Sequence, residues 1–169
     1  MLLTVDCLRN LDFRRLMDLY TEGNRENAEL FYQHLGENQG ILAAENDFYV
    51  YLRDCFFRTK GAMYCIWEEK GIYISALRLE PYRDGLLLEA LETHPDYRRS
   101  GYAKKLIAAV MKWLTAQGSK PVYSHINKRN TASLKTHLAC GFQRISEQAV
   151  YIDGSVTNSS CTMCCNRAI

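Results

Sequence analysis

The chain has 169 residues, of which 47% are hydrophobic and 24% charged, and its formal net charge at pH 7 is +2. These fractions exclude a disordered, collagen-like or coiled-coil chain and predict a single globular domain over residues 1–169. The near-neutral charge argues against nucleic acid as the main partner. The charge is uneven, however, because residues 1–60 carry seven basic and ten acidic side chains, whereas residues 61–169 carry fourteen and nine. The second segment therefore has the positive excess that an anionic ligand needs.

Seven cysteines raise the question of disulfides or a metal site. Residues 1–10 lack the apolar run of a signal peptide, and no stretch approaches the roughly 20 apolar residues of a membrane span. We therefore expect a cytoplasmic protein with reduced thiols and no membrane partner. Cys161, Cys164 and Cys165 have no second C-x-x-C and no histidine nearby. They are interpreted as small side chains of a terminal strand, and no metal is expected.

Residues 1–60 are predicted to be mostly helical after a first strand at Leu2–Cys7. Apolar residues at spacings of three and four between Phe13 and Tyr20 indicate the first of three helices. The boundary signals are Asn10 or Asp12 before the first helix, Gly23-Asn24 after it, Gly36 at the end of the second, and Asn46 or Asp47 at the start of the third.

After Gly61 the pattern changes to short strands separated by turns. Strands are predicted over Met63–Trp67, Ile72–Leu79, Leu86–Thr93, Val122–Ile126, Phe142–Ile152 and Cys161–Cys165, with turns at Glu68–Gly71 and Pro81–Gly85. Helices are predicted over Gly101–Gln117 and Thr131–Cys140. The first of these is clearly amphipathic, since Leu106, Ile107, Val110 and Leu114 share one stripe. This order of elements indicates an α/β or α+β domain.

A short basic loop, Arg98-Arg99-Ser100-Gly101-Tyr102-Ala103, joins the third strand of this second segment to the amphipathic helix. Free backbone N–H groups at a helix N-terminus, next to two arginines, form a site for phosphate oxygens. Gly101 lets the backbone approach an anion closely. The alternative is a surface loop whose arginines are merely solvated.

Two motifs together resemble the GCN5-related N-acetyltransferase (GNAT) family. The loop residues 98–103 fit the [Q/R]-x-x-G-x-[G/A] motif that this family uses for the pyrophosphate of acetyl-CoA. Downstream, the segment from Asn130 through Ser133 and His137 to Gly141-Phe142 is similar to the family's second signature. The resemblance covers about residues 63–165. It implies a mixed, mostly antiparallel sheet of about six to seven strands, splayed between the fourth and fifth strands and flanked by helices. Residues 1–60 would then form the substrate side, and residues 61–169 the acetyl-CoA-binding core.

The resemblance also assigns cofactor-binding residues. The backbone of Leu91 and Thr93, beside a bulge, would pair with the pantetheine arm as an added strand does. Lys104, Lys105 or Lys135 would reach the 3′-phosphate. The full set that the resemblance assigns to acetyl-CoA is Leu91, Thr93, Arg98, Arg99, Ser100, Gly101, Tyr102, Ala103, Lys104, Asn130, Ser133 and His137.

The sequence departs from the family pattern at residue 137. Most relatives have a tyrosine there that protonates the leaving thiolate, whereas this chain has a histidine. His137 is the candidate general acid, because histidine titrates near neutral pH. The alternative is that it only packs beside the cofactor, with Tyr102 and Tyr123 as fallback phenols.

The general base is assigned less directly. His125 occupies a strand position where Nα-acetyltransferases of the family often carry a glutamate, so it is the first candidate. Glu89 and Glu92 follow, and their opposite parity along a strand indicates that at most one faces the substrate. A purely structural role for His125 stays open.

The function implied is transfer of an acetyl group from acetyl-CoA to a primary amine by direct attack within a ternary complex. A strand N–H near Leu91 to Thr93 would polarise the thioester carbonyl. The acceptor would be a small molecule, a peptide N-terminus or a lysine, and a homodimer is one option for the assembly. The alternative from another class is a catalytically weak acyl-CoA-binding module with a sensory role.

Overall fold

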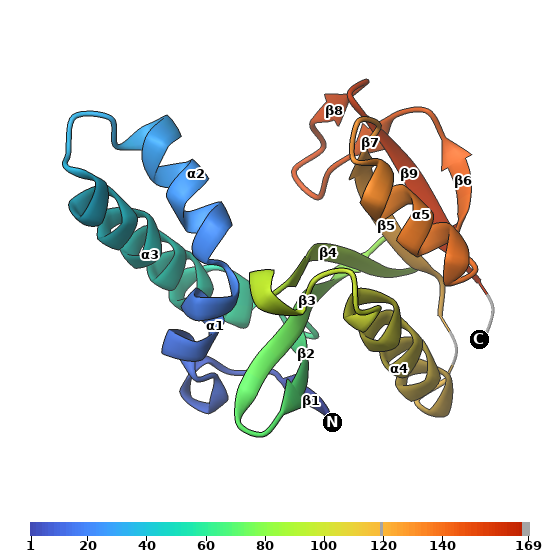
Figure 1. The fold of residues 1–169 in the computed structure, drawn as a ribbon. Coiled ribbons are helices and arrows are strands. Elements are labelled where there is room, and N and C mark those ends of the chain that lie inside the picture. Colours follow the sequence, from blue (N-terminus) through green and yellow to red (C-terminus); the bar gives the residue numbers. More distant parts are fainter. Residues whose placement is uncertain (119, 167–169) are drawn as a thin grey trace.

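The computed structural model describes residues 1–118 and 120–166. Its centre is a seven-stranded sheet with the order β1-β2-β3-β4-β5-β9-β6, in which only β4 and β5 run parallel. A separate two-stranded ribbon is formed by β7 and β8. The predicted mixed, mostly antiparallel sheet flanked by helices is therefore confirmed (Figure 1).

The strands are β1 (Leu2–Val5), β2 (Met63–Glu69), β3 (Ile72–Tyr82), β4 (Gly85–Thr93), β5 (Val122–Asn127), β6 (Gln143–Ser146), β7 (Ala149–Val150), β8 (Val156–Thr157) and β9 (Ser160–Cys165). The helices are α1 (Phe13–Leu19), α2 (Thr21–Phe31), α3 (Glu37–Asp54), α4 (Tyr102–Ala116) and α5 (Thr131–Ala139).

Helices cover both faces of the sheet, and each face has its own apolar core. The α4 face buries Leu106, Ile107 and Val110, as the amphipathic stripe predicted, against strand residues that include Leu77 and Leu88. On the other face, α1 and α3 pack over β1, β2 and β3 around a second core. Figure 1 shows α1, α2 and α3 on one side of the molecule and α4 and α5 on the other. Alternating side chains of one sheet thus divide the apolar interior into two cores.

The parallel strands β4 and β5 pair over three residues only, from Leu86↔Val122 to Leu88↔Ser124, and then diverge. We call the opening between their diverging ends the fork. A bulge accompanies the divergence, because the β3 partners of Glu89 and Glu92 are Arg78 and Ala76, with one β3 residue opposite two of β4. The predicted splay and bulge are therefore both present.

Three helix boundaries differ from the prediction. Gly23 lies inside α2, and the break falls at Tyr20, which ends α1 and precedes α2. Asn24 is buried and its side-chain Nδ2 donates to the Met17 sulfur, so it packs within the helical layer instead of ending a helix. The third helix begins after Gly36, and Asp47 lies in its middle, where it accepts a hydrogen bond from Tyr32, the residue that follows α2.

Two strand predictions also need correction. β3 continues through Pro81, which was expected to start a turn. The neighbouring β2 begins opposite Leu79, so Pro81 has no partner on that side and its missing N–H costs no ladder bond. The single strand expected over residues 142–152 is divided, since β6 pairs with β9 whereas β7 pairs with β8. β9 buries Cys161, Cys164 and Cys165, as predicted for the terminal strand.

Candidate active site

The basic loop before α4 has the backbone geometry of an anion cradle. Arg99 and Gly101 both have positive φ, 61° and 79°, which turns successive N–H groups toward one side. The first intrahelical bond of α4 is Lys105 N–H to Gly101 O, and residues 99–104 donate no backbone hydrogen bond within the described ranges. A Cβ on Gly101 would meet no atom within 4 Å. Six consecutive N–H groups at the positive end of a 15-residue helix are therefore without a backbone acceptor among the described residues.

These groups border a cavity of about 570 Å³ between the start of α4 and helix α5. Of the sequence-predicted cofactor residues, it is lined by Thr93, Arg98, Arg99, Gly101, Tyr102, Ala103 and Lys104. Its other wall comes from α5 and consists of Ala132, Lys135, Thr136 and Ala139. Sequence reasoning named only Lys135 of this wall. The spacing of three and four residues was the available signal, because it places mostly small side chains on one face of the helix.

The cationic side chains near the cavity have different degrees of freedom. Lys104 and Lys135 line it directly. Lys105 is held elsewhere, because its Nζ lies 3.0 Å from Glu69 Oε1 and 4.4 Å from the centre of the Trp67 ring. Tyr102 donates its hydroxyl to the same carboxylate over 3.0 Å, so both side chains of the α4 start are tied to β2. Of the lysines predicted for the 3′-phosphate, Lys104 and Lys135 keep the necessary freedom.

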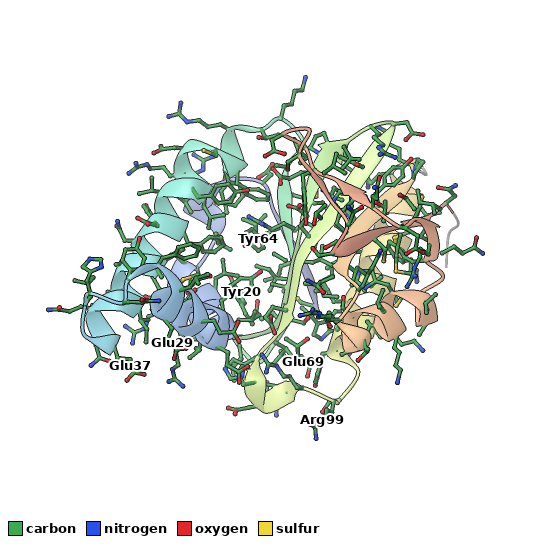
Figure 2. All side chains as sticks on the ribbon, turned by 90° about the horizontal axis from the view of Figure 1, so that it is seen from above. Tyr20, Glu29, Glu37, Tyr64, Glu69 and Arg99 are labelled. Carbon is green, nitrogen blue, oxygen red and sulfur yellow. The ribbon has the colours of Figure 1, made fainter. Side chains whose placement is uncertain are left out.

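Arg98 uses its guanidinium inside the protein. Its Nη2 lies 3.0 Å from Glu92 Oε1, its Nε donates to Thr93 O over 3.2 Å, and its Nη1 is paired with Glu22 at the start of α2. The side chain thus joins the loop to β4 and to the helical layer. Figure 2 shows Arg99, in contrast, at the outer edge of the loop with its side chain extending away from the sheet.

The fork lies next to this loop. Thr93 ends β4, and its hydroxyl lies 3.0 Å from Ser75 Oγ. Its N–H is 3.2 Å from Glu92 Oε1. Leu91 is the second residue of the bulge and packs its side chain against the α4 core. Ala90, at the bulge, has φ of 49°, and its carbonyl accepts a hydrogen bond from the Tyr20 hydroxyl over 2.9 Å.

The residues of the second signature lie on α5. Asn130 caps the helix through Oδ1, which accepts from Ser133 N–H over 3.0 Å. His137 is buried, and its Nδ1 lies 2.9 Å from Ser133 O. Because a carbonyl only accepts, Nδ1 carries the ring proton, and Nε2 is left as a buried acceptor with no partner among the described residues. Burial lowers the pKa of His137, so the neutral ring has no proton on Nε2 to give.

His125 lies on β5, on the sheet face opposite α4. Its ring is wedged edge-on between Tyr82 and Tyr151, at 5.4 and 5.1 Å between ring centres. Neither ring nitrogen has a hydrogen-bond partner within the described ranges. Burial, helped by the nearby Arg83 charge, lowers the pKa of His125. The ring is therefore a neutral imidazole with a free lone pair near neutral pH.

The opposite parity of Glu89 and Glu92 does not separate them, because the bulge between them adds one residue to β4. Their β3 partners, Arg78 and Ala76, lie on the same face of the sheet, so the expectation based on parity is wrong. Glu92 is engaged with Arg98, as described above. The Glu89 carboxylate lies 3.7 Å from Arg78 Nη2, and its charge acts on the carboxyl of Glu80 on β3. Burial, and then the Glu89 charge, raise the pKa of Glu80, so the Glu80 carboxyl holds a proton more readily than a solvated glutamate does.

Other kinds of site receive little support. Within the described residues, no group of three or more His, Cys, Asp or Glu side chains could hold a metal ion. Across residues 1–118 and 120–166, no helix combines the length and hydropathy needed to cross a bilayer.

Comparison with known proteins places this fold and site in a family. A family model described as the acetyltransferase (GNAT) family matches residues 29–142, which is more than half of the chain. The chain therefore belongs to the GNAT acetyltransferase family, and the resemblance predicted from the two motifs is confirmed.

Curated relatives match over shorter segments. The aminoglycoside N(6′)-acetyltransferase type 1 of Salmonella typhimurium is 38% identical over 66 residues, covering 39% of this chain and 46% of the relative. The [ribosomal protein bS18]-alanine N-acetyltransferase of Haemophilus ducreyi is 32% identical over 79 residues, covering 45% of this chain and 54% of the relative. The matches thus span about half the length of these relatives.

Solved structures match over almost the whole fold. The PaiA N-acetyltransferase of Thermoplasma acidophilum, in complex with coenzyme A, has a TM-score of 0.66 at 13% identity and covers 99% of both chains. The ribosomal-protein-S18-alanine N-acetyltransferase of Escherichia coli has a TM-score of 0.63 at 14% identity, covering all of this chain and 96% of its own. At these identities the likeness establishes the fold alone, and it confirms the predicted GNAT architecture.

Proposed function

We propose that this protein is an N-acetyltransferase that transfers the acetyl group of acetyl-CoA to a primary amine. The observation that carries the proposal is the row of unpaired N–H groups at residues 99–104, which opens onto a cavity beside the fork. Membership of the GNAT family and the acetyltransferase relatives support the same activity.

The residues present fit the chemical groups of acetyl-CoA. The N–H groups of residues 99–104 would hold the pyrophosphate, because a helix N-terminus with a positive-φ glycine binds phosphate oxygens. Lys104 and Lys135 would neutralise the 3′-phosphate from the two walls of the cavity. The backbone of Leu91 and Thr93 would pair with the pantetheine arm, once Arg98 and Glu92 release the peptide groups of Thr93 that they now hold.

When bound, acetyl-CoA supplies a thioester that is already activated, so an amine can attack it directly and release the thiolate. We assign His125 as the base that takes a proton from the amine, since its ring is neutral and its nitrogens are unpaired. Burial and the Arg83 charge, which lower the pKa of His125, oppose this proton uptake. Glu92 is kept as the second base, although its ion pair with Arg98 would have to open first. His137 could donate to the thiolate only after Nε2 takes up a proton, and burial opposes that uptake.

The acceptor belongs to the class of amines with a cationic or polar surrounding. The names of the relatives give an aminoglycoside and an alanine of ribosomal protein bS18 as their acceptors. We also propose that residues 1–169 work as one domain, because the sheet joins β1 to β9. We expect the protein in the cytoplasm, where thiols such as those of β9 stay reduced.

The experiment measures CoA release with acetyl-CoA and a panel of amines that includes an aminoglycoside, spermidine and an alanyl peptide. Turnover with at least one amine is expected. In parallel, CoA binding is measured calorimetrically for wild type, Gly101→Ala and Gly71→Ala. Both glycines have positive φ and open space around the missing Cβ, but only Gly101 lies in the cradle. We expect at least tenfold weaker binding for Gly101→Ala only. Tight acetyl-CoA binding without turnover on any amine would instead favour the acyl-CoA-binding module.

A further inference from the structure

The bulge in β4 needs an external support. Ala90 adopts φ of 49°, a left-handed conformation that is strained for any residue with a Cβ. Within the β3–β4 ladder, Ala90 and Leu91 together face the single residue Leu77, so neither has a regular register partner. A bulge that costs free energy locally persists only where a tertiary contact stabilises it.

Tyr20 supplies that contact from a distant part of the chain. Its hydroxyl donates to Ala90 O over 2.9 Å, across 70 positions of sequence. Its ring meets Phe48 edge-on at 5.9 Å, and its hydroxyl also neighbours that of Tyr64. Figure 2 shows Tyr20 and Tyr64 between the helical layer and the sheet. Loss of solvation raises the pKa of Tyr20 to about 12, so the hydroxyl stays a donor throughout the working pH range.

The geometry of a peptide unit extends this contact to the fork. The Ala90 carbonyl and the Leu91 N–H belong to one planar, trans peptide, in which the C=O and N–H bonds point in opposite directions. When Tyr20 draws the oxygen toward the helical layer, the Leu91 N–H is turned away from that layer. A hydrogen bond accepted by the carbonyl also polarises the peptide and makes its N–H a better donor.

We propose that Tyr20 is a positioning residue for acetyl transfer, because it holds the Ala90–Leu91 peptide so that the Leu91 N–H is aimed at the thioester carbonyl of bound acetyl-CoA. The inference rests on the proposed function and deepens it. It also gives the α1–α2 junction a role, since Tyr20 holds the bulge while Glu22, two residues later, holds Arg98 of the phosphate loop. Through these two contacts, helices α1 and α2 support both the bulge of β4 and the phosphate loop.

The test compares Tyr20→Phe with Tyr73→Phe. The control removes a hydroxyl of β3 that faces the same helical layer and accepts a hydrogen bond from Asp12 N–H, not one that contacts the Ala90 carbonyl. In the cofactor-free protein, the amide resonance of Leu91 is recorded by nuclear magnetic resonance. Tyr20→Phe is expected to move it, and Tyr73→Phe is expected to leave it in place. An unmoved Leu91 resonance in a folded Tyr20→Phe protein overturns the proposal, whether or not the protein is an enzyme.

The proposed effect of Tyr20 on acetyl transfer is tested by vibrational spectroscopy of bound acetyl-CoA labelled with ¹³C at the thioester carbonyl. A hydrogen bond from Leu91 N–H lowers the stretching frequency of that carbonyl, and Tyr20→Phe is expected to lose the shift. The kcat should fall about tenfold while the CoA dissociation constant changes less than twofold. A dissociation constant that weakens as much as kcat falls would indicate a merely structural role and overturn the positioning role. If wild type does not bind acetyl-CoA, the proposed function fails and the proposed effect on acetyl transfer fails with it, whereas the Leu91 resonance still decides whether Tyr20 fixes the peptide.

Discussion

Two glycines of this chain should respond in opposite ways to the same substitution. Gly85 begins β4, and a Cβ built on it would lie 2.0 Å from Pro121 O and 2.8 Å from Pro121 C. Gly23 lies in the first turn of α2, and a Cβ there would meet nothing within 4 Å. Each glycine is replaced by alanine, so the chemical change is identical and only the surroundings differ.

The expected magnitude for Gly85→Ala follows from the clash. Pro121 O accepts the Leu86 N–H at 3.0 Å, at the closed end of the fork. An ordinary contact of about 3.4 Å requires this backbone to retreat by more than about 1 Å. Overpacking of this kind costs about 1–3 kcal/mol, and the weakened hydrogen bond adds about 1 kcal/mol. We therefore expect a loss of about 2–4 kcal/mol in the free energy of unfolding.

For Gly23→Ala the sign reverses. Alanine is favoured over glycine within a helix by up to about 1 kcal/mol, and no atom opposes the new methyl group. The free energy of unfolding is measured for wild type and both variants by urea titration followed by circular dichroism, with the m-value as a check on two-state behaviour. The reasoning is refuted if Gly85→Ala lies within 0.5 kcal/mol of wild type (a limit of about the scatter expected for surface changes). A destabilising Gly23→Ala would indicate that the helix does end there.

Three further predictions concern protonation and capping. Burial puts the folded-state pKa of His137 below its unfolded value of about 6.5, so stability falls as the pH drops below that value, and His137→Phe should give a smaller fall between pH 7 and pH 5 in urea titrations. Hydrogen bonds from Trp67, Lys105 and Tyr102 lower the pKa of Glu69 to about 2. Their contribution is complete above the unfolded value of about 4.5 and disappears as the pH falls toward 2, so Glu69→Gln should show a shallower acid transition, and an unchanged slope contradicts this. Asn130→Ala should cost about 1 kcal/mol by removing the α5 cap, whereas Asn130→Asp should keep the stability, and weaker CoA binding in the second variant would show contact with the cofactor.

The sequence by itself predicted the anion cradle, because every part of it is local. The basic loop, Gly101 and the start of the amphipathic helix lie within about ten consecutive residues, and the dipole and free N–H groups of a helix N-terminus need no distant partner. The strands of the second segment were also recognisable, because alternation and turn residues are short-range signals. The helical third was harder, since Gly23 and Asp47 resembled boundary residues but lie inside α2 and α3.

Only the tertiary structure decided which of these side chains are free to act. Arg98 and Lys105 belong to the same basic stretch as Lys104. Arg98 is paired with Glu22 and Glu92, however, and Lys105 is paired with Glu69. In the same way, the sequence marked His137 as a candidate acid, and the contact of Nδ1 with Ser133 O shows that Nε2 carries no proton.

The bulge is the clearest case of this division. The motif predicted that β4 would open near Leu91, and the structure shows why the opening persists, because Tyr20 reaches Ala90 from 70 residues away. A contact at that separation leaves no periodicity or spacing in the sequence, since it depends on how the helical layer packs on the sheet. The sequence therefore determined the local chemistry of the phosphate loop, and the packing of distant elements decided the geometry of the fork.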